Sequence, residues 1–593
     1  MKRIQILIYI AVSLGLLSSC QKDLLDQTPE TRISDADYWK TANDLKLYAN
    51  NFYNNMLPNH NGWGSLGIYG LDATGSDDMI GLSYNSAWNG ERVLPSSGGG
   101  YGGYGDWSEL RNVNYLIVNA NKVEEPFDNL KTYIGEALFF RANFYFSKLK
   151  SFGALPWINI PLTTNSPEVF SERLPRNVIA DSIINDLDKA VSYLPTKSKA
   201  QASRINKEIA MLLQARIALY EGTWERYHKG TDFGVEGSDG TKYLEKAATV
   251  ASELLNNSGG YALNMFSNDP NGYWKLFNQV DYSGNNEIML WRAFNLSLNL
   301  GHRWHRYSTT GAGRGITKDL VDAYLCKDGL PISVSKLYKG DATLLNVVTD
   351  RDPRMAQTIY INDGQHIITN NRPNGQAPVL FEYPSFDAAN ENRSLTGYQI
   401  YKGHNPDYNQ QQDLGTTGQI IFRFAEAHLI YAEAKAELNQ LTQADLDKSI
   451  NLLRARVNMP KMELGNLAAD LNPEFKKVNT LINEIRRERR IEFAAEGYRS
   501  DDLFRWAAMG EKIFKSKPKG AKRAQWEGAD VPAPILKAVG QLPVDANGYI
   551  EYYQNVGGLK DGYQFKINRD YLSPIPTDQR VLNPKITQNP GWE

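Results

Sequence analysis

Aromatic and planar polar side chains are concentrated in two loop-like stretches of this 593-residue chain, one Gly-rich and N-terminal, the other central. A pyranose ring has an apolar C–H face and a belt of hydroxyls. A site for it therefore needs flat rings for the face and Asp, Asn, Gln or Arg groups for the hydroxyls. We predict glycan-binding side chains at Asp77, Asp78, Trp88, Arg92, Tyr101, Tyr104 and Trp107 in the first stretch, and at Trp274, Trp291 and Trp304 in the second.

The same rings could instead fill the cores of loops or contact a partner protein. Large aromatic side chains are usually buried in folded proteins, so packing is the commoner role for any one of them. The sequence does not decide which of the two stretches holds a ligand, and both stay open.

No motif in the chain demands catalysis or a cofactor. The run 98–103 matches G-x-G-x-x-G, but no buried strand precedes it and no βαβ unit follows, which favours a flexible loop over a nucleotide site. His302 and His305 lack a nearby carboxylate at ligand spacing, so we expect no metal site. Carboxylate pairs such as Glu433 and Glu437 occur, but spacing alone does not show the separation that glycosidases use.

The composition is that of a globular protein with little net charge. The chain has 65 Lys and Arg against 67 Asp and Glu, and 42% of its residues are hydrophobic, so a disordered tail and a basic nucleic-acid binder are both disfavoured. Cys20 and Cys326 are the two cysteines, which excludes a disulfide framework and a Cys-rich zinc site. We expect Cys326 to be a small buried hydrophobic residue.

The first twenty residues have the features of an export signal. A positive start is followed by an apolar run over 4–17 and by small residues that lead to Cys20. The run is shorter than the roughly 20 residues that span a bilayer, which disfavours a transmembrane anchor. The segment looks like a bacterial lipobox, so we predict a signal peptide at 1–19, a lipid on Cys20 and a tether over 20–34. An ordinary secreted protein with a chance cysteine is the alternative.

The elements that must position these residues are mostly helices. Apolar residues recur at three- and four-residue spacing in two blocks, 35–257 and 421–511, and Gly, Asn, Asp and Pro interrupt the chain over 258–420 and 512–593. We therefore expect a mainly α-helical body of paired helices over 35–593 with a long, irregular, aromatic-rich central part. The expected helices are 35–56, 109–123, 132–152, 177–194, 205–220, 243–255, 421–438, 445–457 and 479–496.

One predicted helix carries an unusual row of charges. Glu484, Glu488, Glu492 and Glu496 follow one another at i,i+4 spacing and would repel each other unless arginines of the same or a second helix pair with them. We interpret this helix as a solvated scaffold element with an internal salt-bridge network, and not as a nucleic-acid patch.

Five segments together resemble the SusD/RagB family. They are GEALFFRA at 135–142 with FG at 152–153; PR, DL and LP between 175 and 195; RFAE at 423–426 with AEA at 432–434; IRRERRIEFAAEGYRSDDLFRW at 485–506; and YLSPIP at 571–576 with NPGW at 589–592. The matches occur in family order and, with the lipobox, cover nearly the whole chain.

The resemblance implies more than the spacing shows. Such proteins are surface-facing outer-membrane lipoproteins with four helical-hairpin (TPR-like) repeats, and they work with a SusC-like TonB-dependent barrel. They capture glycans, or in some members peptides, for import and do not catalyse a reaction. The ligand loops differ between members, so glycan capture is our leading expectation, with peptide capture and a surface glycosidase as alternatives.

Overall fold

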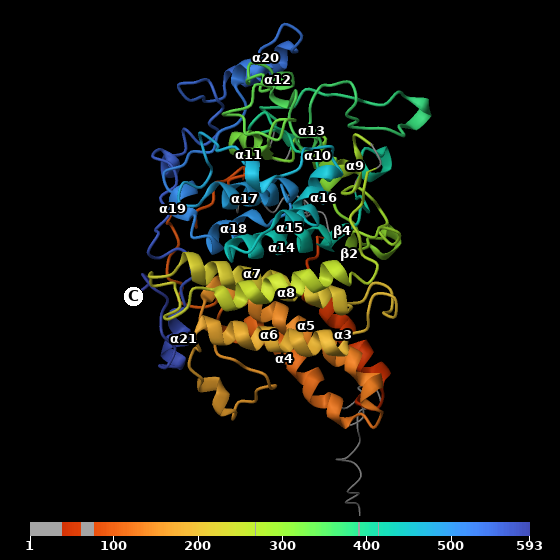
Figure 1. Ribbon diagram of the computed structural model, residues 1–593, viewed down its shortest axis with the longest axis vertical. Coiled ribbons are helices and arrows are strands. Elements are labelled where there is room, and N and C mark those ends of the chain that lie inside the picture. The colour runs from red at the N-terminus through yellow and green to blue at the C-terminus, as the bar shows by residue number, and fades with distance from the viewer. Residues whose placement is uncertain (1–37, 61–75, 267–268, 389–391, 413) are drawn as a thin grey trace, which may run out of the picture.

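The computed structural model describes residues 38–60, 76–266, 269–388, 392–412 and 414–593 (Figure 1). The predicted signal peptide, the lipidated Cys20 and the tether over 20–34 lie outside the described residues. The prediction of a mainly α-helical fold is confirmed.

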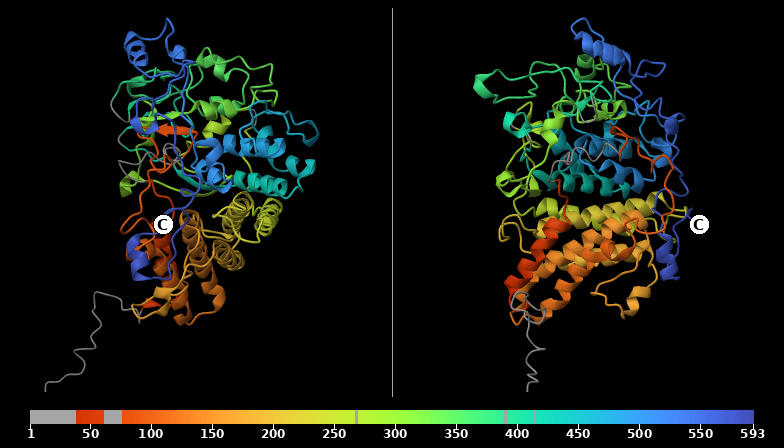
Figure 2. Two further views of the ribbon diagram at one scale, coloured as in Figure 1. Left: turned by 90° about the vertical axis from the view of Figure 1, so that its left-hand side faces the viewer. Right: turned by 180° about the vertical axis from the view of Figure 1, so that it is seen from behind.

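The helical part consists of long helices that pack in layers (Figures 1 and 2). Helix α5 packs on α3, α4 and α6, α7 packs on α6 and α8, and α14 packs on α7, α8 and α17. The pairs α5–α6 and α7–α8 are the predicted helical hairpins. The bounds of these helices are α3 (Ala42–Asn55), α4 (Gly103–Asn119), α5 (Phe127–Phe152), α6 (Arg176–Tyr193), α7 (Lys207–Tyr227), α8 (Thr241–Asn256), α14 (Ala425–Glu437), α17 (Thr480–Glu492) and α18 (Arg499–Arg505).

Small residues let two of these helices approach closely. Ala210, Ala215 and Ala218 of α7 are fully buried. A Cβ atom added at Gly222 of α7 would lie 2.8 Å from the backbone nitrogen of Leu244 in α8. Glycine is therefore required at this contact, where a larger residue would push the two helices apart.

Two predicted helices differ from the structure. The one expected to begin at residue 421 begins instead at Ala425, because 419–423 form strand β4 (Gln419–Arg423), antiparallel to β2 (Ile288–Arg292) with Arg292 opposite Gln419. The run Ile-Ile-Phe in β4 consists of β-branched and aromatic residues, which are enriched in strands. The expected helix 445–457 is two short helices, α15 (Gln443–Asp447) and α16 (Ile450–Ala455), because the backbone leaves the helical region at Ser449.

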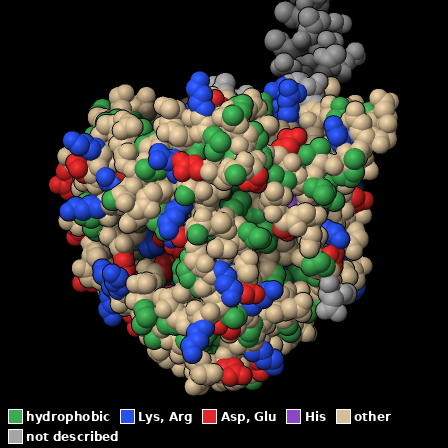
Figure 3. All heavy atoms as spheres, turned by 90° about the horizontal axis from the view of Figure 1, so that it is seen from above, with side chains coloured by type: hydrophobic (Ala, Val, Ile, Leu, Met, Phe, Trp, Pro, Cys, Tyr) green, Lys and Arg blue, Asp and Glu red, His purple; other side chains and the backbone are tan. Residues whose placement is uncertain are grey.

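The rest of the chain forms the loop-rich end of the molecule and the C-terminal segment. A second small sheet pairs β1 (Met79–Gly81) with β3 (Arg314–Ile316), with Met79 opposite Ile316. Seen from above, this end carries positive and negative side chains interspersed with small apolar groups (Figure 3). Its short helices are α9 (Gly272–Lys275), α10 (Trp304–Ser308), α11 (Lys318–Ala323), α12 (Leu344–Val348), α13 (Pro353–Ala356), α19 (Met509–Lys512), α20 (Ala533–Gly540) and, beside α4 and α6, α21 (Thr577–Leu582).

Helix α17 holds the predicted salt-bridge network, but inside the protein. Its residues from Ile482 to Glu492 are buried, so the expectation of a solvated helix is wrong. Carboxylates that point into the core need partners there. The arginines come from other elements: Glu488 lies 2.7 Å from Arg354 and 2.7 Å from Arg454, and Glu492 lies 2.7 Å from Arg423, 3.1 Å from Arg354 and against Arg456.

Three buried histidines should make the fold sensitive to mild acid. Burial lowers the pKa of His228 to about 3 and the pKa values of His404 and His428 to about 4. Each ring also has a hydrogen bond to a backbone carbonyl, which raises the pKa but by less than burial lowers it. In the unfolded chain these rings protonate near pH 6.5. Between that pH and the folded pKa values the unfolded state binds more protons, so stability is lost as the pH falls from about 6.5.

We expect each of these histidines to lower the free energy of unfolding by about 2 kcal/mol between pH 7 and pH 5. Glu225 acts in the opposite sense, because burial raises its pKa to about 7. Urea unfolding at pH 7, 6 and 5 measures how the free energy of unfolding changes with pH. His404→Gln should make this change smaller. Equal stability at pH 7 and pH 5 would contradict the expectation.

Candidate functional site

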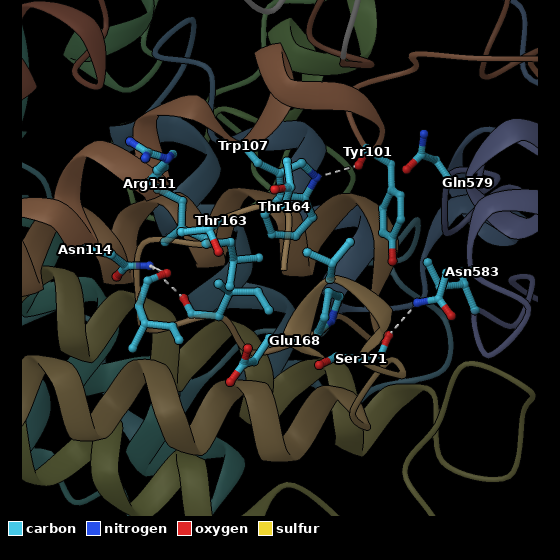
Figure 4. A pocket seen from close by; sticks show the side chains of 17 residues that line it. Tyr101, Trp107, Arg111, Asn114, Thr163, Thr164, Glu168, Ser171, Gln579 and Asn583 are labelled. Carbon is cyan, nitrogen blue, oxygen red and sulfur yellow. Dashed lines mark hydrogen bonds between the residues drawn. The ribbon is translucent and has the colours of Figure 1, made fainter. Parts of the chain in front are cut away.

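A cavity of about 670 Å³ opens between α4, the segment that follows α5, and α21 (Figure 4). Such a volume and a lining that is mostly apolar with a few polar groups are typical of small-molecule sites. The lining residues are Tyr101, Trp107, Leu110, Arg111, Asn114, Pro156, Ile158, Ile160, Leu162, Thr163, Thr164, Glu168, Val169, Ser171, Gln579, Asn583 and Ile586.

Two of the predicted aromatic residues form one wall of the cavity. Tyr101 and Trp107 have ring centroids 6.0 Å apart and perpendicular rings, and the indole Nε1 of Trp107 donates a hydrogen bond of 2.6 Å to the backbone oxygen of Tyr101. Tyr101 also lies edge-on to Phe152, 5.0 Å away. Edge-to-face contacts of this kind are favourable and fix the orientation of the rings.

The Gly-rich run before α4 places these rings. Gly100 and Gly103 have φ values of 79° and 81°, which only glycine adopts without strain. The turn brings Tyr101 back against the start of α4. There it contacts Trp107, which lies about one helical turn into α4. The run predicted as a flexible loop is thus a turn that orients the aromatic wall.

The aliphatic wall is fixed by buried polar groups. The Asn114 side-chain nitrogen donates to the backbone oxygens of Ile158 (3.0 Å) and Ile160 (3.2 Å), and its oxygen accepts from Arg141 (3.0 Å). Arg141 is held in turn by Asp186 at 2.7 Å. Both N–H groups of Asn114 and one lone pair of its oxygen are thus used within the protein, so its role is to hold the wall.

Side chains from both ends of the chain supply the polar groups. Arg111 comes from α4, Glu168 from the 3₁₀-helix η4 (Pro167–Phe170), and Gln579 from α21. Asn583, just after α21, donates 2.9 Å to the backbone oxygen of Ser171 and so closes one side of the cavity (Figure 4). Arg111, Glu168 and Gln579 are half-buried and offer donors and acceptors to a bound molecule.

The other predicted residues of the first stretch lie outside the cavity. Asp77 pairs with Arg499 at 2.6 Å, and Asp78 pairs with Arg490 at 2.6 Å. Both carboxylates are thereby engaged in buried ion pairs. Trp88 is buried in the hydrophobic core, and Arg92 donates to the backbone oxygen of Asp570 at 2.6 Å. Tyr104 lies in α4, but its side chain is outside the described part of the structure.

The central stretch uses its rings for packing. Trp274 stacks on Tyr401 with centroids 4.9 Å apart, and its indole nitrogen donates to the backbone oxygen of the same residue. Trp304 is buried in a second core, and Trp291 is half-buried beside Tyr282. The structure thus brings Tyr101 and Trp107 together in the cavity and leaves these three tryptophans elsewhere.

Sequence reasoning missed the two other sides of the cavity. Ile158, Ile160 and Leu162 alternate with other residues in a Pro-rich segment, which reads as a connecting loop. Gln579 and Asn583 follow the C-terminal YLSPIP motif at 571–576, in a stretch where we predicted no site residue. The alternation of aliphatic residues could have indicated the side formed by 158–162. No local pattern indicates that Gln579 and Asn583 belong to a cavity.

Histidines and cysteines do not form a metal site in the described ranges. No group of three or more His, Cys, Asp or Glu side chains is placed there to hold a metal ion. His302 and His305 are buried, with ring centroids 5.4 Å apart. Cys326 is free and buried, as predicted. Among the helices that the structure describes, none has the length and apolar character needed to cross a bilayer.

Comparison with known protein families decides the classification. The family model described as "SusD family" matches residues 292–592, and the model described as "Starch-binding associating with outer membrane" matches residues 107–219. The chain belongs to the SusD family. The resemblance seen in the sequence motifs is confirmed.

Relatives and solved structures cover nearly the whole chain. SusD-like protein P38 of Formosa agariphila is 24% identical over 85% of this chain and 91% of its own length. A SusD-like protein of Bacteroides ovatus is 23% identical over 98% of this chain and 97% of its own. The crystal structure of a SusD-like carbohydrate binding protein from Bacteroides fragilis is 22% identical, covers 93% of this chain and 100% of its own, and has a TM-score of 0.68. The predicted SusD-like fold is therefore confirmed.

Proposed function

We propose that this protein captures a glycan in the cavity behind Trp107 and passes it, unaltered, to a SusC-like TonB-dependent barrel in the outer membrane. The observation that supports it most is the cavity itself, in which an oriented pair of rings faces a few planar polar groups. The second family model that matches this chain is described as starch-binding, which agrees with a glycan ligand. A solved structure titled "Laminarin binding SusD-like protein" shares the fold, with a TM-score of 0.53.

The lining of the cavity supports binding without cleavage. Glycosidases commonly use two carboxyl groups about 5 to 9 Å apart on either side of the bond that breaks. Among the described residues that line the cavity, Glu168 is the one carboxylate. A sugar held there meets a single acid and no opposing partner.

Lipidation of Cys20 would hold the protein at the membrane surface. The model described as "associating with outer membrane" agrees with this location. A covalent lipid anchors a protein from outside the bilayer and leaves the body free to move over a partner.

Replacing Cys20 by alanine should release the protein from the membrane. The predicted anchor is covalent lipid on the thiol, so its loss removes the main membrane attachment. Fractionation and immunoblotting of cells that express Cys20→Ala or wild-type protein measures this. Cys326→Ala is the matched control and should leave the protein in the membrane fraction. Tight association of Cys20→Ala with membranes would contradict lipid anchoring.

A panel experiment tests the proposed function. The full-length protein in detergent is incubated with immobilised glycans and with peptides, and both retention and new reducing ends are measured. Retention of a glycan without cleavage is the expected result. Retention of peptides alone would indicate peptide capture, and new reducing ends would indicate a glycosidase.

A further inference from the structure

The buried part of the cavity is lined mainly by apolar side chains, while its two charged groups lie towards solvent. Leu110, Ile158 and Ile586 are at most 8% exposed, whereas Arg111 and Glu168 are half-buried. A sugar hydroxyl that enters such a pocket exchanges its hydrogen bonds to water for contacts with carbon, which is unfavourable. The deep part of the cavity therefore fits an apolar group better than an unsubstituted sugar edge.

Two of the buried polar side chains on the lining are already engaged. The Asn114 amide donates to two backbone oxygens and accepts from Arg141. The Asn583 amide donates to the Ser171 oxygen, and its own oxygen accepts from the backbone nitrogen of Lys585. Both N–H groups of Asn114 and one N–H group of Asn583 are thereby used within the protein, and each amide oxygen already accepts one hydrogen bond.

The hydroxyl of Tyr101 is the exception. The residue is 3% exposed, its ring lies on the cavity wall, and its hydroxyl has no hydrogen-bond partner among the described residues (Figure 4). A buried hydrogen-bond donor without a partner lowers the stability of the protein, and an acceptor atom on a ligand would supply the missing hydrogen bond. The buried part of the pocket therefore combines aliphatic carbon with the unpaired O–H donor of Tyr101, which fits a small apolar group that carries one acceptor oxygen.

We propose that the glycan bound here carries an acyl group of the acetyl class, whose methyl group packs on Leu110, Ile158 and Ile586 and whose carbonyl oxygen accepts a hydrogen bond from the Tyr101 hydroxyl. This inference rests on the proposed function and specifies its ligand. Acetyl esters and acetamides share this chemistry. An acetamide also has an N–H group, for which the half-buried Glu168 is an acceptor on the same lining.

Paired oligosaccharides that differ only in acylation test the proposal. The probes are acetylated xylo-oligosaccharides and the same sample after mild alkaline deacetylation, and, for the acetamide source, chitotetraose and its deacetylated form. Isothermal titration with the full-length protein in detergent should give at least tenfold tighter binding for the acetylated member of one pair. The pair that shows the difference identifies the source of the acyl group.

Tyr101→Phe removes the hydroxyl and keeps the ring that packs on Trp107 and Phe152. It should reduce the preference for the acetylated member over its deacetylated form about five- to tenfold, the effect of one buried hydrogen bond. Tyr84→Phe is the matched control, because the Tyr84 hydroxyl bonds to Glu91 and lines no part of the cavity. Thermal unfolding checks that both variants fold.

Equal binding of both members of each pair, or an unchanged preference in Tyr101→Phe, would overturn the acyl proposal while glycan capture stands. A protein that retains no glycan of the wider panel would overturn the proposed function, and the acyl proposal with it.

Discussion

Replacing Glu492 by glutamine should lower the free energy of unfolding by about 3–5 kcal/mol, because removing one member of a buried ion pair leaves charge without compensation. Glu492 is fully buried and lies 2.7 Å from Arg423 and 3.1 Å from Arg354, with Arg456 also in contact. Burial raises its pKa, but the three guanidinium groups outweigh burial and lower the pKa to about 2. The carboxylate is thus charged at neutral pH, and glutamine keeps its shape without the charge.

An exposed ion pair provides the matched control. Asp128 and Lys131 lie 2.6 Å apart at the surface, with the Asp128 side chain 82% exposed. Asp128→Asn should change stability by less than about 1 kcal/mol, since solvent screens such pairs. Urea unfolding followed by circular dichroism measures both variants. A loss in Glu492→Gln no larger than that of the control would show that the network does not hold the fold.

Replacing Trp107 by alanine should weaken binding of the retained glycan by about 1–3 kcal/mol, or roughly 5- to 150-fold in Kd, taking the stacking of planar ligands on aromatic side chains as the analogue. Trp107 is half-buried, and its ring lines the cavity. Its indole N–H is engaged with the Tyr101 oxygen, so the face of the ring is what it offers to a sugar.

Trp291→Ala distinguishes the two aromatic stretches that the sequence left open. Trp291 is also half-buried but lies on β2 beside Tyr282, outside the cavity. Titration with the same glycan should give an unchanged Kd for this variant. Loss of binding in Trp291→Ala together with wild-type affinity in Trp107→Ala would move the ligand to the central stretch.

Local patterns in the sequence predicted most of the helical scaffold. The helix expected at 132–152 is α5, which ends at Phe152 as expected because Gly153 adopts a φ of 68°. It begins five residues earlier, after Pro126, since proline is tolerated at a helix start. The strand β4 was missed because its short apolar run lies directly before α14 and is compatible with both structures.

The buried charges and the cavity depend on contacts between distant residues. Spacing showed that the glutamates of α17 need partners, but Arg354 and Arg423 lie far away in the chain and in separate elements. In the same way, Tyr101 and Trp107 could be found from one local stretch, whereas Gln579 joins them across more than 450 residues. Asp77 and Asp78 are of a residue type that commonly binds sugar hydroxyls, which is why the sequence suggested them. Their ion pairs with Arg499 and Arg490 can be seen only in the folded structure.

Glycan capture in the cavity can be examined by a crystal structure of the protein soaked with the retained oligosaccharide. We expect an intact sugar chain against the Trp107 ring, within reach of Arg111, Glu168 and Gln579. An empty cavity with the sugar bound elsewhere, or a cleaved product between two carboxylates, would contradict it.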